Sequence, residues 1–197
     1  GALFSGESEF ADITLRDVVV GDHTGADASL LQDGALLLDR VEMASTTTDA
    51  VFRIAGAGSA QIRDSEVSQA SGTLIDIVND QGFPSLEVED SMLTASDVVI
   101  DANKVALVTL DDSTLVSSNT STIAGSLQIS ADRTLIWSDA DAALGILNSF
   151  AGLTRTTLHG RPGRAAMVVD TSNFFLDRVL LHHGVGASGS VLQCTDS

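Results

Sequence analysis

The chain has 197 residues, and its 10 basic and 27 acidic side chains give a formal net charge of −17. Nucleic acids and anionic lipid surfaces attract basic faces, so this charge excludes either one as an electrostatic partner. Hydrophobic residues form 44% of the chain, which is enough for a sizeable core, yet no apolar run approaches the roughly 18 residues of a membrane span.

An eight-residue pattern recurs along the chain. Its first and third positions are apolar, its fourth and fifth are mostly charged, and its sixth and eighth are small or apolar. The third positions lie 23 residues apart on average, and the period-two alternation within each copy predicts strands. A repeat of this length built from short strands predicts a β-solenoid. The copies are residues 13–20, 36–43, 60–67, 86–93, 108–115, 127–135 (one residue longer), 151–158 and 174–181.

Two strands meet inside each copy. The first and third positions share one parity and the sixth and eighth share the other, so a bend must lie at the fourth and fifth positions. Asp is frequent there, and it tolerates left-handed backbone geometry better than most residues. Most copies also follow a third apolar pair, which predicts a third strand. These pairs are Phe52 and Ile54, Ile75 and Ile77, Val98 and Ile100, Leu144 and Ile146, Val168 and Val169, and Leu192 and Cys194.

The bend residues of successive coils are expected to lie about 5 Å apart. Opposite charges in the early copies, such as Arg16 beside Asp39, predict ion pairs between coils. The run Asp64, Asp90 and Asp112 lacks a basic residue and would offer oxygen ligands to Ca²⁺, although solvated bend residues are the interpretation we favour. The sequence therefore predicts no metal site and no cofactor.

The longer loops are expected on one edge of the rod, between the second and third strands of each coil. All four histidines, including His23, fall in these loops. In the last three coils, loops 137–142, 159–164 and 182–189 gather the lone Trp with acidic, basic and imidazole side chains. An indole can stack on a sugar, Arg can bind a carboxylate, and His or Asp can move protons. The candidate ligand-binding residues are Trp137, Asp139, Asp141, His159, Arg161, Arg164, His182 and His183.

With these coils laid out, the chain from about residue 9 onward resembles the right-handed parallel β-helix superfamily of pectate lyases and autotransporter passenger domains. The copies at 60–67, 86–93 and 108–115 are most similar to bacterial surface β-helix repeats. The resemblance implies an all-β, single-stranded, right-handed parallel β-helix of about eight coils. The segment 161–164 is similar to the catalytic-arginine segment of pectate lyases, but its spacing differs and that family's calcium segment is missing. The resemblance therefore favours the fold over an enzymatic activity.

We expect residues 1–197 to form one β-helix domain that is a segment of a larger secreted or cell-surface bacterial protein. Its expected role is structural or adhesin-like and non-catalytic, with a polysaccharide or another surface protein as partner. Two alternatives use the loop edge of the last coils: a polysaccharide lyase or hydrolase, with Arg161 or Arg164 acting with His159 or His182, and a glycan-binding module. The sequence leaves the oligomeric state and the partner of the single cysteine, Cys194, open.

Overall fold

The chain winds into a parallel β-solenoid. The computed structural model contains strands and turns, with no helix among the residues that it describes and hence none there that could cross a membrane. It makes about six turns spaced about 23 residues apart, so the predicted fold class is confirmed with slightly fewer coils than eight. The right-handed sense of the coil stays a prediction. The structure describes residues 5–6, 12–24, 29–78, 82–103, 107–118, 123–125, 128–170, 172–183 and 192–195.

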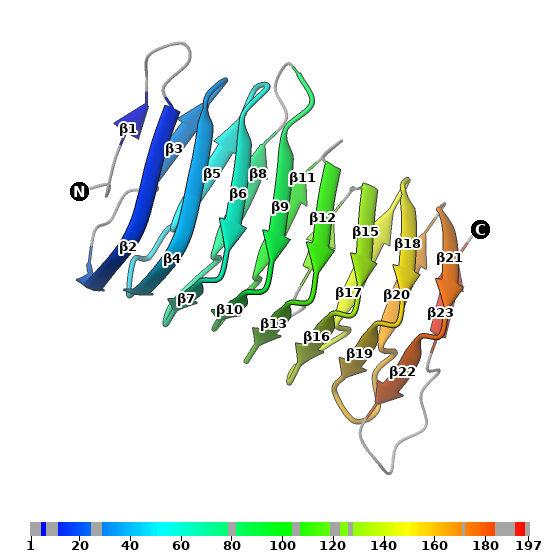
Figure 1. Cartoon of the computed structure of the whole chain (residues 1–197). Coiled ribbons are helices and arrows are strands. Elements are labelled where there is room, and N and C mark those ends of the chain that lie inside the picture. The colour runs from blue at the N-terminus through cyan, green and yellow to red at the C-terminus, as the bar shows by residue number, and fades with distance from the viewer. Residues whose placement is uncertain are drawn as a thin grey trace.

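Three faces enclose one core, and Figure 1 shows their strands stacked along a common axis with the termini at opposite ends. All eight copies of the repeat supply a strand to the first face. Its strands are β2 (Asp12–His23), β4 (Ala35–Ser45), β6 (Ser59–Arg63), β9 (Ser85–Glu89), β12 (Leu107–Asp111), β15 (Gln128–Asp132), β18 (Phe150–Thr154) and β21 (Asn173–Asp177).

The second face begins after the bend in each copy. Because β4 continues through its bend, it pairs with strands of both faces and joins them into one 14-stranded sheet. The second face continues with β7 (Glu66–Gln69), β10 (Met92–Ala95), β13 (Thr114–Ser117), β16 (Leu135–Ser138), β19 (Thr157–Gly160) and β22 (Leu180–His183).

The third face is a separate nine-stranded sheet that closes the cross-section. Its strands are β1 (Ser5–Gly6), β3 (Ser29–Gln32), β5 (Phe52–Ala55), β8 (Ile75–Val78), β11 (Ile100–Asn103), β14 (Ile123–Gly125), β17 (Leu144–Leu147), β20 (Met167–Asp170) and β23 (Leu192–Thr195).

The core is a set of aliphatic rows that run along the axis. Alternate residues of each strand point inward, so equivalent positions of neighbouring turns stack on one another. In the row Leu38, Ile62, Val88 and Leu110, each residue pairs in register with the next and is at most 1% exposed. The third position of the repeat is therefore the centre of the core, as predicted.

The register predicted for the sixth copy is wrong by two residues. Leu110 pairs with Ala131, and Ala131 pairs with Leu153, whereas the expected partner was Ile129. The copy is the regular octet 129–136, which needs no extra residue. The error arose because Ala131 is too small to stand out as a core position in the sequence, although it is only 2% exposed. The correction places Arg133 in the bend.

Two of the third-strand pairs also need correction. In β11 the buried residues are Ile100 and Ala102, where Val98 and Ile100 were expected, and in β20 they are Met167 and Val169. The positions that the sequence pattern missed hold a small side chain, Ala102, and an unbranched one, Met167. The expected pairs in β5, β8 and β17 are confirmed, and β23 lies at the expected position.

A buried row of hydroxyl groups follows the bend at the sixth position. The Ser65 amide donates to Oγ of Ser91 at 3.1 Å, and the Ser91 amide donates to Oγ of Ser113 at 3.3 Å. Each hydroxyl also donates to the carbonyl two residues before it, as Ser91 does to Glu89 at 2.7 Å. The row thus satisfies backbone groups where the bend interrupts the strand ladder.

Candidate functional site

The bend places one outward side chain per turn in a column along the rod. All its residues have a positive φ between 44° and 54°, as the parity argument predicts. Arg shares this strained position with Asp, so the column carries both signs of charge. Its members are Asp17, Arg40, Asp64, Asp90, Asp112, Arg133, Arg155 and Arg178. We call them the bend column.

Ion pairs connect the bend column to neighbouring turns. Arg40 donates through Nε to Asp17 at 2.6 Å, which confirms the predicted pairing of the early copies. Further along, Arg133 contacts Asp112 at 2.6 Å and Asp111 at 2.7 Å, both on the preceding turn. The hydrogen bond from Arg133 is the main cause that lowers the pKa of the Asp112 carboxyl. The bend column therefore holds adjacent turns in register.

Arg133 changes the interpretation of the acidic run. Asp112 is not one of three unpaired carboxylates, because Arg133 stacks next to it in the same column. Asp64 and Asp90 are exposed at the bend. No group of three or more His, Cys, Asp or Glu side chains is placed to hold a metal ion within the part of the chain that the structure describes.

The candidate aromatic residues form a second column, on the outer side of the second face. Trp137 of β16 pairs in register with His159 of β19, which pairs with His182 of β22. The Trp137 and His159 rings stack with centroids 3.7 Å apart and planes 9° apart, and the His159 and His182 rings follow at 4.5 Å. We call these three residues the ring column. They lie in strands, near the strand ends, and not in the loops where the sequence placed them.

Stacking within the ring column determines which ring surfaces stay open. One indole face of Trp137 is covered by His159, so a sugar could not stack on that face. The indole Nε1 donates to Asp139 at 2.6 Å, which fixes the ring edge. Partial burial and the neighbouring His182 lower the pKa of His159, and the Asp139 carboxylate partly offsets that effect. Of the predicted residues, the structure thus brings together Trp137, Asp139, His159 and His182.

The two histidines approach through one nitrogen each. Nδ1 of His182 lies 2.7 Å from Nδ1 of His159. His182 is exposed and His159 is partly buried, so the contact is open to solvent on one side. His183 holds the last position of β22, in register with Gly160, and its side chain lies outside the described residues, as does that of His23.

Arg161, Arg164 and Asp141 lie in turns next to the ring column. Arg161 and Arg164 are exposed in the turn between β19 and β20, where the Arg164 amide donates to the Arg161 carbonyl at 3.0 Å. The Arg161 amide in turn donates to the carbonyl of Asp141. Among the described residues, these two arginines are the only ones whose guanidinium group makes no ion pair. They therefore offer uncompensated positive charge on an acidic protein.

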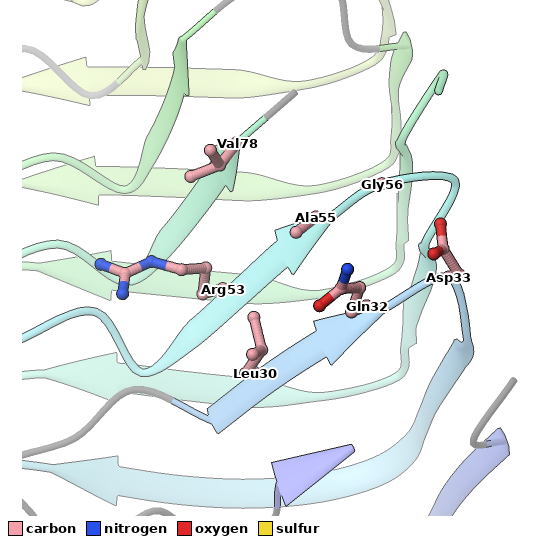
Figure 2. A pocket seen from close by; sticks show the side chains of 7 residues that line it. All are labelled: Leu30, Gln32, Asp33, Arg53, Ala55, Gly56 and Val78. Carbon is pink, nitrogen blue, oxygen red and sulfur yellow. The ribbon is translucent and has the colours of Figure 1, made fainter. Parts of the chain in front are cut away.

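A hollow of about 380 Å³ lies on the third face, where no sequence pattern predicts a site. Figure 2 shows its lining residues on β3, β5 and β8 and just after the ends of β3 and β5, with the Arg53 guanidinium pointing away from Gln32 and Asp33. Arg53 pairs with Asp76 and Asp49, and Asp33 accepts the Ala57 amide at 2.6 Å. The polar groups of this hollow hold the turns together and do not converge on one point.

Gly56 at the rim of the hollow is required by its surroundings. Its φ is +64°, and an added Cβ would lie 2.1 Å from Oδ1 of Asp33 on the preceding turn. The Asp33 carboxylate occupies the space where a side chain of residue 56 would lie. Gly56 is therefore explained by the tight turn at this corner of the coil and not by a ligand.

Comparison of the chain with protein-family models, with curated proteins and with solved structures gives no match. The fold alone defines the class of this protein, a parallel β-solenoid. Because no known protein matches, function has to be argued from the residues of this chain.

Proposed function

We propose that this chain is a non-catalytic, adhesin-like structural segment of a secreted or cell-surface bacterial protein. The observation that carries the proposal is that charged side chains of the repeat form ion pairs between neighbouring turns. The bend column repeats in every turn, and three of its four arginines, Arg40, Arg133 and Arg155, pair with carboxylates of a neighbouring turn. A rod whose repeated polar groups stabilise its own stacking suits a spacer or a display scaffold.

The placement of the candidate residues gives further support. In an acid–base site, the proton-transfer groups and the charged groups converge on one substrate atom. Here the imidazoles contact each other and Trp137, whereas the Arg161 and Arg164 guanidinium groups make no described contact with them. The surface location rests on the resemblance of the Asp-Ser copies to bacterial surface repeats.

A second candidate is a module that binds an acidic polysaccharide. It is favoured by Arg161 and Arg164, which carry no carboxylate partner among the described residues while every other described arginine does. Guanidinium groups bind carboxylates with paired hydrogen bonds, so uronate polymers fit this turn best. Two hydrogen bonds connect this turn to the segment that follows Trp137. The Trp137 indole Nε1 donates to Asp139, and two residues further on the Asp141 carbonyl accepts the Arg161 amide.

One experiment separates these functions. The protein is mixed with bacterial, plant and algal polysaccharides, including uronate polymers, and both retention and release of unsaturated product are recorded. A structural segment gives neither. Product release would overturn the proposal and make the chain a lyase.

Retention without product would favour the second candidate, provided that it depends on the free arginines. Double replacement of Arg161 and Arg164 by Gln should then abolish retention. The matched control is Arg178→Gln, since Arg178 is also exposed but is paired with Asp177. Retention that survives the double replacement would exclude this turn as the binding site.

A further inference from the structure

We propose that His159 and His182 form a two-histidine site for a Cu²⁺ or Ni²⁺ ion on the outer side of β19 and β22. This inference is independent of the proposed function, because it rests only on the two side chains and on the coil that stacks them. The parallel register places His182 directly beside His159 on the next turn. The stacking of successive turns therefore brings the two imidazoles to one point on the surface.

The separation of the nitrogens selects the type of ion. The two Nδ1 atoms lie 2.7 Å apart. An ion about 2.0–2.1 Å from each nitrogen would then subtend an angle of about 80–85° at the metal. This is close to the right angle between neighbouring ligands in the tetragonal sites of Cu²⁺ and Ni²⁺, and far below the tetrahedral angle of structural Zn²⁺ sites. The geometry therefore favours Cu²⁺ or Ni²⁺ over Zn²⁺.

The chemistry of the pair is suited to such an ion. Neutral imidazole is a common ligand of Cu²⁺ and Ni²⁺. Without metal, one ring donates its Nδ1 proton to Nδ1 of the other, so the contact is an N–H···N hydrogen bond. On binding, the donating ring gives up that proton and carries one on Nε2 instead, which leaves both Nδ1 lone pairs for the ion. Water completes the coordination, because His182 is exposed.

The stacking also supplies a reporter. The chain has one Trp and no Tyr, so tryptophan emission comes from Trp137 alone. Trp137 stacks on His159 at 3.7 Å, whereas His182 lies two turns away from it, on the far side of His159. A paramagnetic ion held by the two histidines would therefore quench the emission, and replacement of His182 leaves the indole environment in place.

The test is a Cu²⁺ titration of the whole chain followed by tryptophan emission. We expect saturable quenching with one ion per chain, which is lost in His182→Gln and retained in the control His23→Gln, whose residue lies at the end of β2 in the first turn. Non-saturable quenching, or saturable quenching that His182→Gln leaves unchanged, would overturn the site.

Two further measurements make the outcome specific. Electron paramagnetic resonance of the Cu²⁺ complex should show coupling to two imidazole nitrogens in the native chain, and this two-nitrogen signal should be absent from His182→Gln; coupling to a single nitrogen in the native chain would exclude a shared ion. In competition, Ni²⁺ should displace the bound Cu²⁺, followed by its electron paramagnetic resonance signal, at a lower concentration than Zn²⁺ does. Equal or better displacement by Zn²⁺ would contradict the right-angle geometry assigned to the pair.

Discussion

The inside and the outside of this solenoid follow opposite rules. Inside, each row repeats one kind of side chain, as in the aliphatic row through Leu38 and Leu110 or the hydroxyl row through Ser65 and Ser91. Outside, the chemistry changes along each column: the column of Trp137 and His159 begins with small side chains such as Ser68. Uniform rows fix the coil, and the variable columns leave room for function without cost to the core.

The largest expected effect comes from breaking an interior row. Leu110 is 1% exposed and stacks between Val88 and Ala131. Leu110→Ala removes buried methyl groups and leaves a cavity, which should lower the free energy of unfolding by about 2–5 kcal/mol. Chemical denaturation measures this change. Thr109→Ala, the outward neighbour on the same strand, is the control and should change stability far less; equal effects would contradict the inward assignment.

A smaller loss of stability is expected when the hydroxyl row is interrupted. Ser91 is 5% exposed; its Oγ accepts the Ser65 amide and donates to the Glu89 carbonyl. Ser91→Ala leaves the Ser65 amide without that acceptor, and an unsatisfied buried group costs about 1–3 kcal/mol. The same denaturation measurement tests it against Ser130→Ala, at an exposed position of β15. A neutral Ser91→Ala would mean that the row is not needed for stability.

The sequence predicts the interior of the solenoid better than its outer surface. Interior rows repeat, so periodicity alone predicts the strands and, in every copy but the sixth, the position of the bend. It failed at Ala131 and Ala102, where a small core residue carries no apolar signal. The contact between His159 and His182 depends on register across 23 residues, and their common place in successive copies was the available signal. Which guanidinium groups stay free could not be read from the sequence, because pairing depends on side-chain direction.

An outward column can also weaken the fold. Asp101 is half-buried on β11, and burial together with the nearby Asp76 and Asp97 raises the pKa of its carboxyl. A raised folded-state pKa means that ionisation opposes folding, so stability falls as the pH rises from the ordinary Asp value of about 4. Asp101→Asn should therefore melt slightly above the native chain at pH 7.

The pH dependence checks the cause. Below about pH 3 the Asp101 carboxyl is protonated in both states, so the melting temperatures of the variant and the native chain should converge. Asp141→Asn, at an exposed turn, is the control and should shift the melting temperature little at either pH. A gain for Asp101→Asn that persists in acid would point to packing and not to charge.

The smallest effect, with the opposite dependence on pH, is expected in the bend column. Arg133 pairs with Asp111, Asp112 and Asp132, and it lowers the pKa of Asp112. Such a pair stabilises the fold above the ordinary Asp pKa and is lost as the pH falls through the lowered value. Arg133→Gln should thus reduce the melting temperature modestly at pH 7, less at high salt, and not in strong acid.

Arg178→Gln is the matched control for this replacement. Arg178 has a similar positive φ, but its side chain is more exposed (68% against 38% for Arg133), and it pairs with Asp177 of its own turn. The backbone penalty of the two replacements is therefore similar, and the difference between them isolates the contacts that Arg133 makes with the preceding turn. If both variants melt alike at low salt and neutral pH, the ion pairs between turns contribute nothing measurable, and the hydroxyl and aliphatic rows alone hold the coils in register.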